Sequence, residues 1–243
     1  MVVDRALRKL TPAELFLLTT PDDTEDAYWM VTPEYEWNIV NLLMSILRLH
    51  IARQNLRWYV AAELLVVAPI RPRNRRPLSV APDLMMAESD STERTSWKIV
   101  EEGRPPAFVL EVVTAESIGR DLDDKPEIYD AMGVQEYALF APRRTDGGAV
   151  LSGFSRGTDG VFAPWPVVVQ GMLRSAVLGL DLVVVDGRWL RLRDRDGGLL
   201  PSAEEEATVA MRERLRADAE AGRADAAEAE LARLRALLEK HGA

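Results

Sequence analysis

The chain has 243 residues, of which 47% are apolar, and its formal charge is −9, from 30 basic and 39 acidic residues. This length allows one hydrophobic core and an appendage. The absence of cysteine excludes disulfides, thiolate metal sites and a cysteine nucleophile, and the two histidines argue against zinc or Ser-His-Asp chemistry. No apolar run is long enough to span a membrane and the first residues are unlike a secretory signal, so a cytoplasmic protein without a membrane partner is expected.

The first third of the chain predicts helices followed by strands. A short helix is expected before residue 24, and a longer one from Thr32 to Asn55, with Thr32 as its N-cap and a proline at its first position. Apolar residues recur every three or four positions along the second helix, so one face of it is buried. Strands are expected at 58–68 and 78–87.

Two clusters of arginine stand out against the acidic composition. An acidic protein that binds nucleic acid must concentrate its positive charge locally. The clusters comprise Arg71, Arg73, Arg75 and Arg76, and then Arg143 and Arg144. The first cluster is bounded by prolines, so a solvated loop is the alternative to a DNA contact.

The middle of the chain alternates between strands and a helix. The expected elements are a loop with a weak helical turn at 89–103, strands at 107–114, 136–141, 149–155, 161–169, 179–185 and 188–193, and a helix at 123–132 that ends at Gly133. This succession predicts the α/β class, as an α+β mixed sheet with extra β-hairpins. Residues 1–199 would form one domain and residues 200–243 a C-terminal helix.

The C-terminal segment predicts a long helix. Ser202 and Glu205 form a capping-box pattern, and the residues that follow are mostly strong helix formers without proline. Leu231, Leu234 and Leu238 keep heptad spacing, although the seam positions before them are alanine. Such a helix could pair two protomers as a short coiled coil, or it could lie against the body of the protein.

Glu111 is the most unusual residue of the chain. It lies in the run FVLEVV (108–113), whose composition is that of a buried strand. A buried carboxylate is costly unless it is paired or binds a metal. Asp83 ends an earlier apolar segment, and Lys125 begins the helix that follows.

Two acids and a lysine at strand and helix ends suit metal-assisted hydrolysis of a phosphodiester. Carboxylates hold the divalent cation, and a lysine can orient the water or offset charge on the phosphate. Asp83 and Glu111 are the candidate metal ligands, Lys125 is the candidate cation, and the backbone carbonyl of Val112 or Val113 is a possible further ligand.

The segment that carries these residues resembles the Uma-type family of restriction-endonuclease-like proteins, a branch of the PD-(D/E)xK nuclease superfamily. Four motifs carry the resemblance, and their specificity lies in the combination. They are Pro82-Asp83, Glu111-Val112-Val113-Thr114, Lys125 with Tyr129, and Gly133-Val134-Gln135-Glu136-Tyr137. The similarity extends over about Tyr28 to Val185.

The resemblance implies a restriction-endonuclease-like core, a DNA substrate and Mg²⁺ or Mn²⁺ as the cofactor. In the superfamily a lysine usually lies two residues after the glutamate; here that position is Val113, and Lys125 would serve from the helix. A glutamate on the first core helix is also common, for which Glu36 is the candidate, before Glu34. Pro126, directly after the lysine, is a departure that limits how the helix can begin.

The sequence thus leads to two hypotheses. The first is a metal-dependent DNA endonuclease, acting as a homodimer so that two active sites address two strands. The second is a non-catalytic binding or scaffold protein that retains the fold and uses its C-terminal helix for partners. The acidic composition and Pro126 favour the second hypothesis, and the set of Asp83, Glu111 and Lys125 favours the first.

Overall fold

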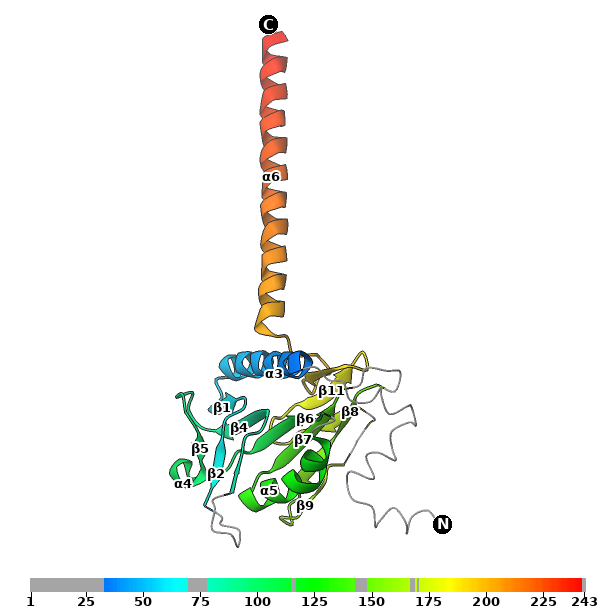
Figure 1. Cartoon of the computed structure of the whole chain (residues 1–243). Helices are drawn as coiled ribbons and strands as arrows, with labels where there is room; N and C mark the ends of the chain where they lie inside the picture. Colours follow the sequence, from blue (N-terminus) through cyan, green and yellow to red (C-terminus); the bar gives the residue numbers. More distant parts are fainter. Residues whose placement is uncertain are drawn as a thin grey trace. The chain divides into compact units, whose positions relative to one another are not determined.

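The computed structural model describes residues 33–69, 78–114, 117–142, 148–166, 169 and 171–241 (Figure 1). The helices are α3 (Pro33–Gln54), α4 (Ile99–Glu102), α5 (Lys125–Met132) and α6 (Ala203–His241), and a π-helical turn, η1 (Arg120–Asp124), precedes α5. The strands are β1 (Trp58–Ala61), β2 (Val66–Ala68), β3 (Leu78–Val80), β4 (Leu84–Glu88), β5 (Trp97–Lys98), β6 (Phe108–Val112), β7 (Glu136–Ala141), β8 (Val150–Arg156), β9 (Phe162–Pro164), β10 (Met172–Arg174), β11 (Asp181–Val185) and β12 (Trp189–Arg193).

A six-stranded mixed sheet forms the centre of the fold. Its strand order is β1-β4-β6-β7-β8-β9, and of its five pairings only that of β6 with β7 is parallel. The parallel pair encloses η1 and α5 as its crossover, as a βαβ unit requires. Two three-stranded sheets, β3-β2-β5 and β10-β11-β12, accompany the central one.

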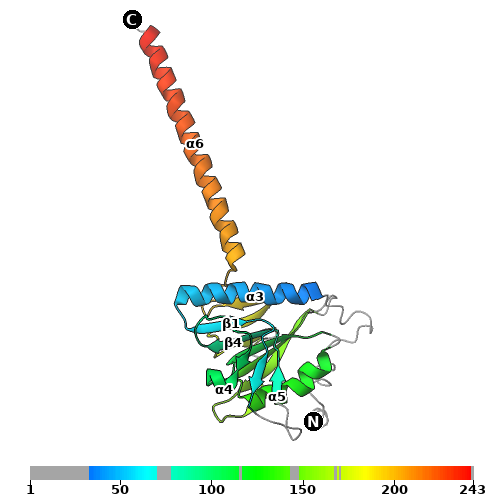
Figure 2. The same cartoon turned by 60° about the vertical axis from the view of Figure 1, so that its left-hand side comes forward.

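The central sheet is covered on both faces. On β6, Phe108, Leu110 and Val112 join a core cluster that includes residues of α3 and β12, whereas Val109 and Val113 join a second cluster with residues of α5. Helix α3 runs along one face above β1 and β4, while α5 lies on the opposite side (Figure 2). Because side chains alternate along a strand, the odd-numbered residues of β6, Glu111 among them, face α5.

Several expected strands are shorter than predicted. The run 58–68 is divided between β1 and β2, which belong to different sheets, and 78–87 is likewise divided between β3 and β4. Glu63 has a left-handed backbone (φ 51°), which turns the chain between β1 and β2. The prediction of one strand was therefore wrong in both places, and among the described residues of 161–169 the strand is β9, Phe162–Pro164. Strand β10 was not predicted. The expected loop at 89–103 contains the expected helical turn, α4, and also β5, which was not expected.

The helical segment that carries Lys125 begins earlier than the predicted residue 123, but its first turn is π-helical and the α-helix itself begins at Lys125. The turn η1 precedes α5, and within it the N–H of Lys125 bonds to the carbonyl oxygen of Arg120, five residues back. Pro126 has no N–H to donate and would crowd the preceding turn of a regular α-helix, so the wider π turn accommodates it. At the other end, Gly133 (φ 86°) caps α5 as expected.

Contacts divide the chain into two compact units, with the boundary between Leu200 and Pro201. In the second unit, the N–H of Glu205 bonds to the Ser202 hydroxyl and the N–H of Ser202 bonds to the Glu205 carboxylate, so the predicted capping box is present. The predicted helix is confirmed as α6. None of the helices within the described residues combines the length and the apolar composition that a membrane crossing needs.

The expected helix before residue 24 and both arginine clusters, at 71–76 and 143–144, lie outside the described residues.

Candidate active site

The pairing of β4 with β6 brings Asp83 and Glu111 together. The last pair of this antiparallel register is Leu84 opposite Leu110, so the next step along both strands sets Asp83 opposite Glu111. The N–H of Asp83 points to Oε2 of Glu111 at 3.4 Å. Both side chains thus occupy the same face of the sheet.

Glu111 is almost completely buried, with 1% of its surface exposed. Its Oε1 accepts hydrogen bonds from the Tyr129 hydroxyl at 2.6 Å and from the Lys125 ammonium at 2.8 Å. Both donors lie on α5, which covers this face of the sheet. The helix therefore supplies the polar partners that a buried carboxylate needs.

Lys125 makes two ion pairs. Its ammonium lies 2.8 Å from Oε1 of Glu111 and 2.7 Å from Oδ1 of Asp121, four residues earlier in η1. Burial acts to lower the pKa of Lys125, but its two carboxylate neighbours outweigh it, and the pKa is raised. The lysine is consequently held in its charged form.

Asp83 links the strand end to the backbone of β6. Its Oδ2 accepts the N–H of Val112 at 2.6 Å. This bond fixes the carboxyl group of Asp83 beside the residue whose carbonyl was the candidate third ligand. Of the two tyrosines, Tyr129 bonds to Glu111, whereas the Tyr137 hydroxyl donates to the backbone oxygen of Asp121 at 2.8 Å.

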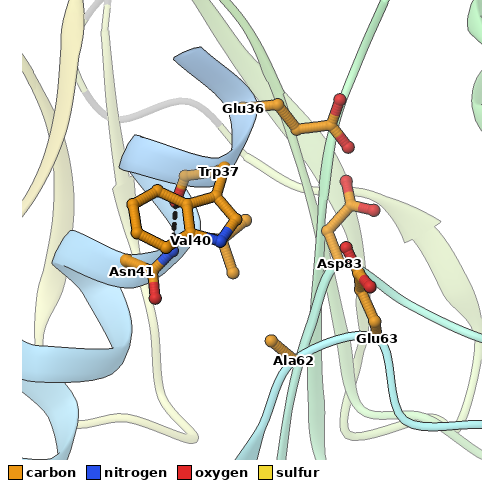
Figure 3. Close-up of a pocket in the computed structure, with 7 residues that line it drawn as sticks. All are labelled: Glu36, Trp37, Val40, Asn41, Ala62, Glu63 and Asp83. Carbon is orange, nitrogen blue, oxygen red and sulfur yellow. Dashed lines mark hydrogen bonds between the residues drawn. The ribbon is translucent and has the colours of Figure 1, made fainter. Parts of the chain in front are cut away.

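Asp83 faces an open hollow of about 360 Å³. The lining residues are Glu36, Trp37, Val40, Asn41, Ala62, Glu63 and Asp83. Figure 3 shows the carboxyl groups of Glu36, from the first turn of α3, and Asp83 turned toward each other, with Glu63 close by. Trp37 is 63% exposed, so the hollow combines an acidic wall with an exposed aromatic ring.

Burial raises the pKa of three carboxyl groups of the site, and neighbouring carboxylates add to the effect. Burial, reinforced by the charge of Asp83, raises the pKa of Glu111 to about 8, in spite of the nearby lysine. Burial and the charges of Asp83, Glu63 and Asp121 raise the pKa of Glu36 to about 7. Burial also raises the pKa of Asp83, against the lowering effect of the Val112 N–H. Burial and the neighbouring carboxylates therefore favour the protonated forms of these groups while no cation is bound.

A family model described as "Putative restriction endonuclease" (Uma2) matches residues 28–165. The chain belongs to this Uma2 family. A comparison with curated proteins found no match. Membership in this family indicates a nuclease. The fold agrees with the predicted restriction-endonuclease-like core, since it has a mixed sheet with flanking helices and a long C-terminal helix.

The Uma2 match covers every candidate site residue named from the sequence, since all lie between residues 28 and 165. The structure brings Asp83, Glu111 and Lys125 into one connected cluster and sets Glu36 across the hollow from Asp83. Glu34, the less favoured alternative to Glu36, is exposed and does not line the hollow.

The donors of the cluster suit a hard divalent cation, but they do not form a closed cage. Among the described residues, no three His, Cys, Asp or Glu side chains converge closely enough to hold a metal ion. Mg²⁺ is commonly held by only one or two carboxylates, with water and substrate phosphate completing the shell. Asp83 and Glu111, with the carbonyl of Val112, fit that kind of open site.

Two acidic residues of the cluster were missed in the sequence. Glu63 was placed within a strand, although a charged residue in the apolar run AAELLVVA carries the same signal as Glu111. Asp121 lies four residues before Lys125, the spacing at which opposite charges meet on a helix. That spacing would have identified Asp121 if the predicted helix had begun before Asp123.

Proposed function

We propose that the chain is a divalent-metal-dependent endonuclease that hydrolyses phosphodiester bonds of DNA. The observation that carries the proposal is the meeting of Asp83, Glu111 and Lys125 on one face of the sheet, beside an open acidic hollow. Burial raises the pKa of Glu111 and Glu36 and neighbouring carboxylates reinforce the shift, and a cation bound beside these groups would favour their charged forms.

Asp83 and Glu111 would hold Mg²⁺ or Mn²⁺, with the backbone carbonyl of Val112 as the third protein ligand. Bound there, the cation would activate a water molecule and neutralise charge that develops on the phosphate. Lys125, whose ammonium is 2.8 Å from Glu111, would orient the attacking water or offset charge on the scissile phosphate. Glu36 would hold the water network on the opposite side of the hollow.

The hollow gives a phosphate access to these groups. It is open and has about 360 Å³ of space, and Asp83 contributes to its wall. Its carboxylates would repel a phosphate that arrives without a cation, because Lys125, which pairs with Glu111, has only 10% of its side chain exposed. Substrate binding and cation binding are therefore coupled in this proposal.

The test is cleavage of supercoiled plasmid DNA by the purified chain with Mn²⁺ or Mg²⁺, repeated after chelation of the metal. Nicked or linear product that requires the cation supports the proposal. Absence of cleavage with either cation, from protein that is folded by circular dichroism, contradicts it. A single-stranded DNA and an RNA of the same sequence would identify the preferred substrate.

The alternative of a binding or scaffold protein rests on α6. Within this helix Leu231, Leu234 and Leu237 are all exposed, which suits association with another chain. The same helix could form the homodimer that would place two active sites on the two strands of DNA. Cation-dependent binding of DNA without any cleavage would favour the alternative.

A further inference from the structure

Lys125 has two carboxylate partners, and only one of them belongs to the proposed metal site. Glu111 lies 2.8 Å from the ammonium and Asp121 lies 2.7 Å from it, and each of these carboxylates has 1% of its side chain exposed. Asp121 is absent from the lining of the hollow that Asp83 and Glu36 face. It therefore approaches Lys125 from the protein interior.

Asp121 is held in place from several directions. Its Oδ2 accepts a short hydrogen bond from the Ser117 hydroxyl, and its N–H bonds to the carbonyl oxygen of Ser117 at 2.8 Å. The Tyr137 hydroxyl donates a hydrogen bond to the backbone carbonyl oxygen of Asp121 at 2.8 Å. The π-helical turn η1 sets it four residues before Lys125, on the same side of the helix.

We propose that Asp121 is a positioning residue, which retains the Lys125 ammonium at the site when the Glu111 carboxylate binds a cation. This inference rests on the proposed function. A cation bound to Glu111 would compete with Lys125 for the same carboxylate oxygens, so the ion pair between Lys125 and Glu111 would weaken. The side chain of lysine is long and flexible. Without Asp121 as a second partner, the ammonium of Lys125 would move away from the reacting phosphate.

The test compares Asp121→Asn with the wild type and with Asp124→Asn. The control makes the same change of charge in the same turn, at an exposed side chain. In the cleavage assay we expect Asp121→Asn to lower kcat by roughly 10–100-fold, the usual effect of a misplaced catalytic group, with little change in KM. The control should keep the rate of the wild type, and Asp121→Glu, which retains the charge, should recover part of the loss.

A second readout does not need activity. The chain has four lysines, at positions 9, 98, 125 and 240, so reductive methylation can be followed residue by residue by mass spectrometry. Lys98, with 51% of its side chain exposed, serves as the internal standard. We expect slow labelling of Lys125 in the wild type with or without Mg²⁺. In Asp121→Asn its labelling should rise several-fold on addition of Mg²⁺, because neither carboxylate then holds it.

That dependence on Mg²⁺ separates positioning from a structural role, since a loosened fold would label faster without the cation as well. Labelling of Lys125 that is equal in Asp121→Asn and the wild type, with Mg²⁺ present, overturns the inference. If Asp121→Asn does not fold, Ser117→Ala, which removes one donor to Asp121, should show the same effect in weaker form. A wild type that neither cleaves DNA nor binds Mg²⁺ refutes the proposed function itself.

Discussion

Two buried glutamates on neighbouring strands differ in their surroundings. Glu111 on β6 and Glu136 on β7 are 1% and 4% exposed, and burial raises the pKa of both. Glu136 is surrounded by neutral donors: the hydroxyl of Ser175 and the N–H groups of Ala176 and Val177. Glu111 instead lies among other charged groups, with Asp83 beside it and Lys125 as its counter-ion.

Under the proposed function, the difference separates a structural from a functional carboxylate. Glu136 fixes the loop between β10 and β11, and its hydrogen-bonding capacity is directed to that loop. Glu111 keeps a like charge close by, which costs free energy in the isolated protein and which the proposed cation would offset. Burial alone would not distinguish the two residues, whereas the charge of their neighbours does.

The largest expected effect follows from removing the charge of Glu111. Glu111→Gln should abolish cleavage, because it keeps the shape of the side chain and loses a charged metal ligand. Plasmid nicking in the presence of Mn²⁺ measures it, with Glu127→Gln on the exposed side of α5 as the matched control. Cleavage by Glu111→Gln at the rate of the wild type would place the active site elsewhere.

The second-largest effect on cleavage is expected from the loss of the Lys125 side chain. Lys125→Ala should reduce kcat by roughly 10²–10⁴-fold, the range for a group that transfers a proton or stabilises charge. The variant also leaves Glu111 and Asp121 without their shared cation, so the free energy of unfolding must be measured alongside kcat. Lys98→Ala, at an exposed lysine, is the control. A loss of stability without a loss of kcat in the folded protein would assign Lys125 a structural role only.

Glu136→Gln should give the opposite pattern. An amide cannot accept all the donors that the carboxylate accepts, so the free energy of unfolding should fall by about 1–3 kcal/mol. Cleavage by the folded protein should remain close to that of the wild type. Urea denaturation and the plasmid assay together check this, and abolished cleavage with unchanged stability would remove the distinction between the two glutamates.

The sequence contains much of the fold, in the elements where local signals are strong. The periodicity of α3, the capping box of α6, the apolar runs of β6 and β7 and the glycine after α5 all lead to the observed elements. Glu111 could be identified because a glutamate is out of place in such a run. Each of these signals depends on residues that are close together in the sequence, so it can be recognised without knowledge of tertiary contacts.

What the sequence did not reveal depends on contacts between distant residues. The break at Glu63 separates two apolar strands that pair with different sheets, and neither half carries a sign of its partner. The role of Asp121 depends on a π-helical turn before Pro126, which a regular helix pattern does not predict. The three donors to Glu136 come from a loop about forty residues away, so the sequence could not show that Glu136 and Glu111 have different surroundings.

The pH dependence of stability offers a smaller effect with a definite sign. Glu111 has a pKa raised from 4.5 to about 8 and Glu36 from 4.5 to about 7, so the folded protein keeps protons that the unfolded chain releases. Without metal, stability should therefore fall as the pH rises from about 4.5 to about 8, and then level off. Glu111→Gln should flatten this slope. Denaturation curves across this range measure it, and a rise in stability over the same interval would contradict the raised pKa values.

Divalent cations should reverse the trend, because they take the place of the protons. The stabilisation by Mg²⁺ should grow as the pH rises toward about 8, where the carboxylates no longer have to release protons to bind it. The carboxylate of Glu136 accepts hydrogen bonds from neutral donors of the β10–β11 loop, so Glu136→Gln should leave the effect of Mg²⁺ unchanged. The shift of the melting temperature with and without Mg²⁺ gives the comparison.

The smallest effect on the site is expected from removing residues 201–243. Both glutamates and all their partners lie before residue 200, in the first of the two compact units, so the truncated chain should fold and retain the cleavage rate of the wild type. Helix α6 has 39 residues, and apolar side chains such as Leu231 and Leu234 are exposed along it. Because helices of this kind gain most of their stability from packing, the full-length chain should self-associate through α6.

Light scattering of both forms checks this expectation, which predicts a lower oligomeric state for the truncated chain. A variant with Leu231 and Leu234 both replaced by Ala retains helix propensity and removes the apolar seam, so it should match the truncation in mass and the wild type in cleavage. An unchanged oligomeric state would assign self-association to the first unit. A loss of cleavage in the truncated form alone would show that α6 contributes to the site. The contacts of Glu111 and Glu136 with Tyr129, Lys125 and Ser175 give no reason to expect this result.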